Sequence, residues 1–344
     1  MIDKTALEKR ALHLVVADGR TVAPTLAKEF GLSRQAVSNH LKRLAGEGLI
    51  AADGATRARV WRMAEQVRTT ENFQRAGLSE DHVWRQIFAP VVADLAENVR
   101  DIWRYGITEM VNNAIDHSSA EEVHVGIARN ALYTQAWIAD DGEGIFLKIQ
   151  KALELFDPRE AILELAKGKF TTDPANHSGE GIFFTSKVFD LFDIHSGSLH
   201  FMHEDGTEDL LIERPKDAPG TIVLMRLNND SPRTTKGVFD KFAAPEEYSF
   251  AKTIVPVRLA QYEGEKLVSR SQAKRLTLRF ERFKTVVLDF GGVEEIGQAF
   301  ADEVFRVFQT AHPGTQMIPA NMTPAVKAMI GRAKGHAAAS NPDS

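Results

Sequence analysis

Residues 107–144 read ITEMVNNAIDHSSAEEVHVGIARNALYTQAWIADDGEG, and this stretch decides how the rest of the chain is interpreted. Glu109 and Asn113 are four residues apart, and Asp116 and His117 complete the next helical turn, so these polar groups share one face of a predicted helix. A helix side that simply faces solvent is an alternative interpretation of these four residues.

Two predicted strands follow this helix. Residues 122–128 and 132–139 alternate or run apolar as strands do, and the second ends in Asp140-x-Gly142-x-Gly144. Glycine has no Cβ, so a backbone of this kind can approach a planar or phosphate-bearing ligand closely. The Asp140 carboxylate can accept a hydrogen bond from an exocyclic amine. A plain hairpin turn is the alternative for Asp-Gly after a strand.

Two further glycine motifs lie downstream. Gly179-x-Gly181 directly precedes the apolar segment IFFTSKVFDLF (182–192), which is predicted to be a helix. Backbone N–H groups at the start of a helix form a favourable site for a phosphate. Gly220-Thr221 then leads into the predicted strand IVLMRL.

In this order, the four motifs resemble the four boxes of the GHKL ATPases. That superfamily includes gyrase-type topoisomerases, certain chaperones, mismatch-repair ATPases, histidine kinases and anti-sigma-factor kinases. The resemblance covers roughly residues 75–230. It implies an α/β two-layer sandwich of the Bergerat type, with ATP and Mg²⁺ as cofactors.

The resemblance also implies a role for each matching residue. Asn113 would coordinate Mg²⁺, which prefers oxygen ligands. Glu109 would act as the catalytic base toward the attacking water. Asp140 would bind the adenine amino group, with Thr221 beside it. The glycines would admit the nucleotide or cradle its phosphates: Gly142, Gly144, Gly179 and Gly181.

Two other parts of the family pattern concern catalysis. Lys167, Lys169 and Thr171 lie where a lid is expected, and one of them is a candidate phosphate contact. Histidine kinases carry a phosphoacceptor His before this domain. His82, in SEDHVWRQ, is the single histidine of residues 66–104, and its neighbours do not match the phosphoacceptor pattern well.

The N-terminal residues predict a winged helix-turn-helix. Apolar spacing predicts helices over 4–16, 21–30 and 33–48, with Thr21 capping the second, and 49–63 predicts two short strands. Helix, glycine-containing turn and helix form the helix-turn-helix pattern, and the strands would form its wing. The segment GLSRQAVSNHLKRLAGEGLI resembles bacterial repressor-type winged-helix domains.

DNA is the predicted partner of this module. Residues 1–64 carry a net charge of +5 within a chain of net charge −5. The predicted third helix and the wing offer side chains of the types that bind base edges and phosphates. A small protein–protein module is the alternative. The predicted DNA-binding residues are Arg34, Gln35, Ser38, Asn39, Lys42, Arg57 and Arg59.

The last part of the chain alternates strands and helices, which indicates an open α/β domain. Strands are predicted at 255–259 and 285–290, with a helix at 271–283 between them. The stretch VVLDFGGVEEIGQAFADEVFRVF resembles STAS domains. In phosphorylated STAS members a Ser begins the helix after this strand, whereas this chain has Gly297-Gln298-Ala299 there.

Composition agrees with a cytoplasmic globular protein. The 344 residues include 42 Lys and Arg, 47 Asp and Glu, and no Cys, which excludes disulfides, thiolate nucleophiles and Cys-containing zinc sites. No apolar run reaches the roughly 20 residues of a membrane span. The predicted order is winged helix-turn-helix 1–64, linker 65–80, GHKL domain 81–230, connector 231–252, STAS-like domain 253–334 and disordered tail 335–344.

The preferred interpretation is a DNA-binding transcriptional regulator whose GHKL domain binds and slowly hydrolyses Mg-ATP to change conformation. The alternative is an anti-sigma-type serine/threonine kinase, or a histidine-kinase-like protein, acting on a STAS partner. A scaffold with a degenerate nucleotide site is disfavoured because Glu109 is present. A protein partner at the STAS-like domain and a homodimer are further hypotheses, and no membrane partner is expected.

Overall fold

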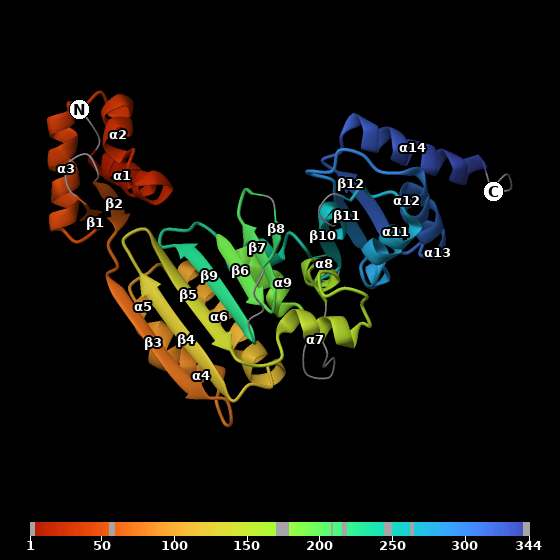
Figure 1. Cartoon of the computed structure of the whole chain (residues 1–344), viewed down its shortest axis with the longest axis horizontal. Helices are drawn as coiled ribbons and strands as arrows, with labels where there is room; N and C mark the ends of the chain where they lie inside the picture. Colours follow the sequence, from red (N-terminus) through yellow and green to blue (C-terminus); the bar gives the residue numbers. More distant parts are fainter. Residues whose placement is uncertain are drawn as a thin grey trace.

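The computed structural model describes residues 4–54, 59–169, 179–207, 209–214, 219–243, 250–261 and 265–339. Three bodies follow one another along the chain: a helical domain with a hairpin, a large antiparallel sheet with helices, and a smaller parallel α/β domain (Figure 1). Buried apolar side chains form one continuous cluster through the second and third bodies and a separate cluster in the first. In the described ranges, no helix combines the length and apolar character needed to cross a bilayer.

The first body has the predicted helix-turn-helix order. Gly31 ends the second helix with a left-handed backbone (φ 63°), and the Ser33 side chain caps the third by accepting from the Ala36 N–H at 3.2 Å. The prediction for Thr21 is wrong: its backbone is helical and its side chain makes no capping bond. The elements are α1 (Lys4–Asp18), α2 (Val22–Phe30), α3 (Arg34–Gly46) and the antiparallel pair β1 (Ile50–Asp53) and β2 (Val60–Met63).

The second body is built on a seven-stranded sheet in the order β3-β4-β5-β9-β6-β7-β8, with every neighbouring pair antiparallel. Alternate residues of its central strands are buried, so one face carries the core. The strands are β3 (Val67–Gln74), β4 (Glu122–Arg129), β5 (Tyr133–Asp140), β6 (Leu191–Ser196), β7 (Leu199–Glu204), β8 (Leu210–Glu213) and β9 (Thr221–Asn228).

The segment predicted to be a linker, 65–80, instead contains the edge strand β3. All eight of its residues pair with β4, and Phe73 packs against the core. The other seven residues of β3 are mostly exposed and polar, as edge strands commonly are. Backbone pairing with β4 holds this strand in the sheet. Its sequence lacks the hydrophobic alternation that predicts a strand, so it resembles a linker.

Helices cover the buried face of the sheet, with α5 and α6 seen behind the strands in Figure 1. The predicted long helix from residue 80 is interrupted at 93–96, and only its second part forms α6. The segment 182–192 also divides: α9 ends at Val188 and Leu191 begins β6. The helices are α4 (Glu80–Val83), a π-helix (Trp84–Phe88), α5 (Ala89–Val92), α6 (Glu97–His117), α7 (Ile145–Ala152), α8 (Glu160–Lys167) and α9 (Gly181–Val188).

The third body is a three-stranded parallel sheet in the order β10-β11-β12, surrounded by helices. A strand was predicted at 255–259, but the observed strand begins at Lys252 and ends at Pro256. Residues 257–259 of the predicted strand lie in a 3₁₀ turn (Val257–Ala260). The elements are β10 (Lys252–Pro256), α11 (Arg270–Thr277), a second 3₁₀ turn (Phe280–Arg282), β11 (Thr285–Asp289), α12 (Gln298–Asp302), a π-helix (Glu303–Phe308), α13 (Gln309–Ala311), β12 (Gln316–Ala320) and α14 (Pro324–Ala339).

Two predicted boundaries of this region change. The connector 231–252 contains a short helix, α10 (Thr235–Phe239), capped by Thr234. The predicted disordered tail, 335–344, begins inside α14, which runs on to Ala339. Residues 340–344 of the predicted tail lie outside the described residues.

Candidate functional site

A cavity of ≈ 260 Å³ opens between α6, α7, α8, α9 and the ends of β5 and β9. Its volume is near the lower end of small-molecule sites, which span roughly 300–1,000 Å³. The walls combine apolar side chains with a few polar groups. Of the residues predicted to bind nucleotide, those that line it are Glu109, Asn113, Asp140, Gly144, Gly179, Gly181 and Thr221.

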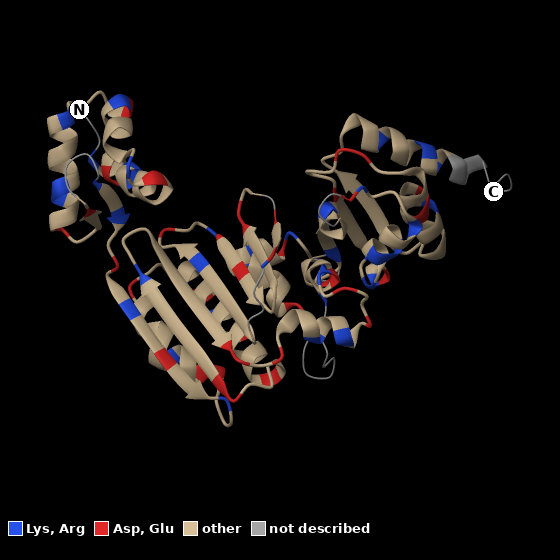
Figure 2. Ribbon diagram, viewed as in Figure 1, with Lys and Arg blue, Asp and Glu red and all other residues tan. Residues whose placement is uncertain are grey.

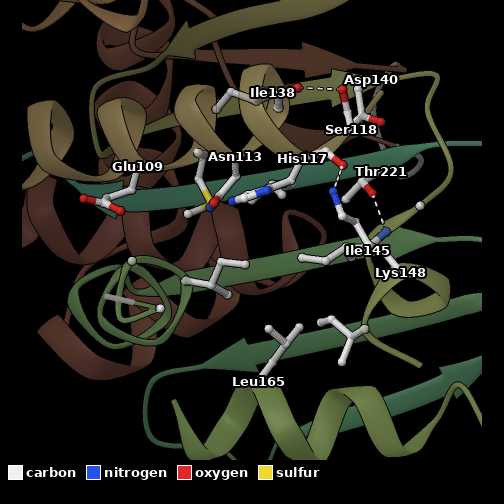
Figure 3. A pocket seen from close by; sticks show the side chains of 18 of the residues that line it. Glu109, Asn113, His117, Ser118, Ile138, Asp140, Ile145, Lys148, Leu165 and Thr221 are labelled. Atoms are coloured by element: carbon white, nitrogen blue, oxygen red, sulfur yellow. Dashed lines mark hydrogen bonds between the residues drawn. The ribbon is translucent and has the colours of Figure 1, made fainter. Parts of the chain in front are cut away.

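Helix α6 supplies the polar wall. Glu109, Asn113 and His117 follow one another at four-residue intervals along the cavity side of α6 (Figure 3). Asp116, which was expected on the same face, is exposed and does not line the cavity. The Asn113 amide nitrogen is buried and has no hydrogen-bond partner within the described part of the chain. Buried polar groups normally have partners, so this amide is available to a ligand.

The start of α9 packs directly against Glu109. A Cβ on Gly181 would lie 2.0 Å from Glu109 Oε2, so glycine is what allows this close approach. The N-terminal end of a helix stabilises a nearby carboxylate. Burial raises the pKa of Glu180 beside it, an effect that the Lys169 ammonium opposes. The Glu109 carboxylate therefore lies where the N-terminus of α9 faces the cavity.

Asp140 lies at the end of β5 in a tight turn. Its Oδ1 accepts a hydrogen bond from the Gly142 N–H at 3.0 Å. Burial raises the pKa of Asp140, and this bond opposes the effect by favouring the carboxylate. A ligand N–H donor would favour the charged form further.

Gly142, unlike the other three glycines predicted to bind nucleotide, does not line the cavity. Its role is local: a Cβ there would lie 1.8 Å from the Ser118 carbonyl oxygen, so glycine lets the turn pass the end of α6. Gly144 does line the cavity and has a φ of 91°, a conformation that glycine adopts without strain.

Thr221 connects the two strand ends to α7. Its hydroxyl oxygen accepts from the Ile145 N–H at 3.0 Å and donates to Ser196 Oγ at 3.3 Å, and Ser196 in turn donates to the Gly220 carbonyl at 2.9 Å. This network satisfies an orphan N–H at the start of α7 and fixes the Thr221 side chain at the cavity edge.

The described part of the cavity wall carries a lysine that no sequence motif predicted. Lys148 on α7 lines the cavity, and its ammonium donates to the His117 carbonyl at 2.7 Å. Its position one turn after Gly144 is the only signal in the sequence. Lys167 and Lys169, which were predicted in a lid, do not line the cavity, and Thr171 lies outside the described residues.

Lys167 and its neighbours on α8 face the third body instead. Lys167 is fully buried and pairs with Glu164 at 2.5 Å, and its ammonium donates to the Leu278 carbonyl at 2.9 Å. Burial lowers the pKa of Lys167, and Glu164 opposes this. Arg279 donates to Glu164 at 2.8 Å and to the Gly168 carbonyl at 3.1 Å. We call Glu164, Lys167 and Arg279 the α8 clamp.

A second candidate site lies on the outer face of α3. Arg34, Gln35, Asn39 and Lys42 are exposed and Ser38 is half-buried, while the opposite face of the helix packs into the core. Gln35 donates to the Asn39 side-chain oxygen at 3.0 Å, so these two amides lie side by side. Lys and Arg are spread over this body in Figure 2.

The wing is only partly described. Arg59 is half-buried, and its guanidinium lies 5.5 Å from the centre of the Trp61 ring, so it stacks on the core rather than extending freely. Arg57 lies outside the described residues. Arg62 pairs with Asp53 at 2.9 Å across the hairpin.

Comparison with family models identifies the two ends of the chain. Residues 5–51 match a model described as winged helix-turn-helix DNA-binding, and residues 272–327 match a STAS-like domain of unknown function. Among curated proteins no match was found. The matches confirm the predicted winged helix-turn-helix and STAS-like modules, and the first indicates a DNA-binding regulator.

Proposed function

We propose that this protein is a DNA-binding regulator whose second body binds Mg-ATP, and that the nucleotide state changes how the second and third bodies are held together. The observation that carries the ATP proposal is the convergence of four separated motifs. Residues from 109 to 221 meet at one cavity, although more than 20 residues separate each motif from the next.

The donor set of the cavity suits a magnesium nucleotide. An amide can turn about its last side-chain bond, so the unpartnered Asn113 side chain can present an oxygen to a hard cation. Bound Mg²⁺ would neutralise phosphate charge. Lys148 would hold phosphate oxygens, and the N–H groups at the start of α9 would contribute a positive dipole end.

The base end of the nucleotide would lie at Asp140. Its carboxylate would accept from the adenine amine, and Thr221 Oγ1 is beside it at the start of β9. Apolar side chains, Met110, Ile138 and Val223 among them, line the same cavity and would cover the purine ring. Glu109 would orient the attacking water and accept its proton.

The route from the cavity to the rest of the chain runs through α8. Leu165 in α8 and Gly168 directly after it line the cavity, while Glu164 and Lys167 of α8 contact the third body. Nucleotide can shift such an arrangement only by binding one state better than the other. Nucleotide binding would thus change how the STAS-like domain is held against α8. A partner bound to the STAS-like domain would be affected by the same change.

The test measures DNA binding and nucleotide binding in one full-length protein. A labelled operator selected from a random DNA pool is titrated without nucleotide and with Mg-ATP, for the wild type and for Asp140→Asn. In a regulator whose nucleotide state is coupled to DNA binding, ATP should change the DNA affinity of the wild type and leave that of Asp140→Asn unaltered. Because coupling is reciprocal, the operator should change the ATP affinity of the wild type by the same factor. Asp141→Asn, an exposed neighbour, is the matched control.

Two outcomes would contradict the proposal separately. Absence of Mg-ATP binding by the wild type would remove the nucleotide function. ATP binding with an unchanged DNA affinity would remove the coupling. Following the γ-phosphate in the same samples distinguishes release of free phosphate, expected of an ATPase, from transfer to protein, expected of a kinase.

A further inference from the structure

Two histidines and an aspartate meet on the sheet face opposite the helices. In β6, Phe192 and Ile194 are buried in the core, so Asp193 and His195 project from the other face. His200 of β7 is the direct cross-strand partner of His195. This cluster is separate from the nucleotide cavity, which none of the three residues lines.

The three side chains converge. One nitrogen from each imidazole and one carboxylate oxygen all lie within 4.8 Å of one another. His200 Nε2 is 2.5 Å from Asp193 Oδ1, and His195 Nε2 is 3.2 Å from Asp193 Oδ2. The two rings stack with their centres 3.9 Å apart. Both imidazoles therefore present a nitrogen to the same carboxylate.

These close contacts leave polar atoms without hydrogen bonds. Asp193 Oδ1, His195 Nδ1 and His200 Nε2 are all buried and have no hydrogen-bond partner among the described residues. His200 Nε2 and Asp193 Oδ1 lie 2.5 Å apart without forming a hydrogen bond. Buried polar atoms without hydrogen bonds are rare, and a ligand that all three side chains bind would account for these atoms.

A neighbouring pair shows what an ordinary His–Asp contact looks like in this sheet. His203, also on β7, has a hydrogen bond between its Nδ1 and Asp209 Oδ1. There, one imidazole meets one carboxylate and neither of the two atoms is left without a partner. In the first cluster, two imidazoles share one carboxylate, and three buried atoms make no hydrogen bond.

We propose that Asp193, His195 and His200 bind a divalent transition metal ion, with Zn²⁺ as the expected occupant. Two imidazoles and a carboxylate are a ligand set that zinc accepts, and it leaves a fourth position for water or an outside ligand. The three residues come from two adjacent strands, so the sheet itself holds the ligands in place.

Direct metal titration of the untagged full-length protein tests this. Zn²⁺ is added to chelator-treated protein in competition with a chromophoric chelator, and Co²⁺ is added in parallel to record its visible absorption. We expect one zinc per chain, bound in the micromolar range or tighter, and a Co²⁺ spectrum typical of four ligands. His200→Gln and Asp193→Asn should each weaken zinc binding by about 100-fold or more. Replacing a residue that only hydrogen-bonds to a metal ligand already lowers metal affinity by about 10–100-fold, and these variants remove a ligand itself.

Controls separate this site from other histidines and from the nucleotide cavity. His124→Gln alters a histidine of β4 on the same sheet, outside the cluster, and should bind zinc as the wild type does. Asn113→Ala should also leave zinc binding unchanged. Circular dichroism establishes that each variant is folded. The proposal is overturned if the wild type binds no zinc at micromolar concentrations, or if His200→Gln binds it as tightly as the wild type.

Discussion

Arg279 of the third body donates a hydrogen bond to Glu164 of α8 at 2.8 Å, and both side chains are almost completely buried. The same guanidinium also donates to the Gly168 carbonyl, and Thr253 donates to the Lys167 carbonyl at 2.8 Å. The last carbonyls of a helix have no partner within the helix. Here the STAS-like domain provides partners, so the end of a cavity helix is held by another domain.

Replacing Arg279 with Ala should destabilise this junction strongly. Glu164 would keep Lys167 but lose its second cation, and the Gly168 carbonyl would lose its donor. Removing one partner of a buried ion pair typically costs about 3–5 kcal/mol. Denaturant unfolding of the full-length protein measures this. Arg306→Ala, which removes an arginine paired with Asp302 outside the clamp, is the control and should change stability far less.

Nucleotide binding should depend on Asn113 and Asp140. Asn113→Ala should weaken binding of Mg-ATP, and Asp140→Asn should weaken adenine nucleotides more than guanine nucleotides. Loss of a hydrogen bond to a charged group costs about 1.5–3 kcal/mol, which is a tenfold to more than hundredfold loss of affinity. Isothermal titration measures both. Wild-type affinity in both variants would refute the assignment of the cavity.

Glu109 should serve hydrolysis rather than binding. Glu109→Gln keeps the size of the side chain but removes the base, which contributes about 10²–10⁴ in rate. We expect normal ATP affinity and slow phosphate release. Glu97→Gln, an exposed position on the same helix, is the control. Equal losses of affinity and turnover in Glu109→Gln would instead mean that its contact with the start of α9 is structural.

DNA affinity should depend on α3 in two distinguishable ways. Lys42→Ala should weaken binding almost equally for all sequences and lower the salt slope by about one unit, because it removes a phosphate contact. Gln35→Ala and Asn39→Ala should relax sequence preference, because amides pair with adenine edges. Lys327→Ala on α14 controls for net charge. Absence of DNA binding by the wild type at low salt would favour a protein–protein role.

The STAS-like domain should not be a phosphoacceptor of its own chain at the position used by related domains. Gly297 is the N-cap of α12, and no Ser or Thr occurs from 286 to 309. Incubation with ATP followed by phosphosite mapping by mass spectrometry checks this. Stoichiometric phosphate within 286–310 would contradict the prediction and favour a kinase.

Local patterns were enough to predict the helix-turn-helix and the motifs around the cavity. The turn at Gly31 and the cap at Ser33 depend on interactions within a few residues, so the sequence determines them. The approach of Asn113 to Asp140 was expected from a family resemblance, and the two do line one cavity. Which small molecule enters that cavity stays a prediction.

Tertiary structure alone decided the features that depend on pairing between distant segments. Strand β3 was taken for a linker because its partner, β4, lies some 50 residues away and its own residues are mostly polar. Lys167 was predicted to lie in a lid, but in the folded chain it is buried and its ammonium donates to the Leu278 carbonyl. His195 and His200 became neighbours only through the register of β6 and β7. Each depends on contacts between segments that no local periodicity records, and only the folded chain brings them together.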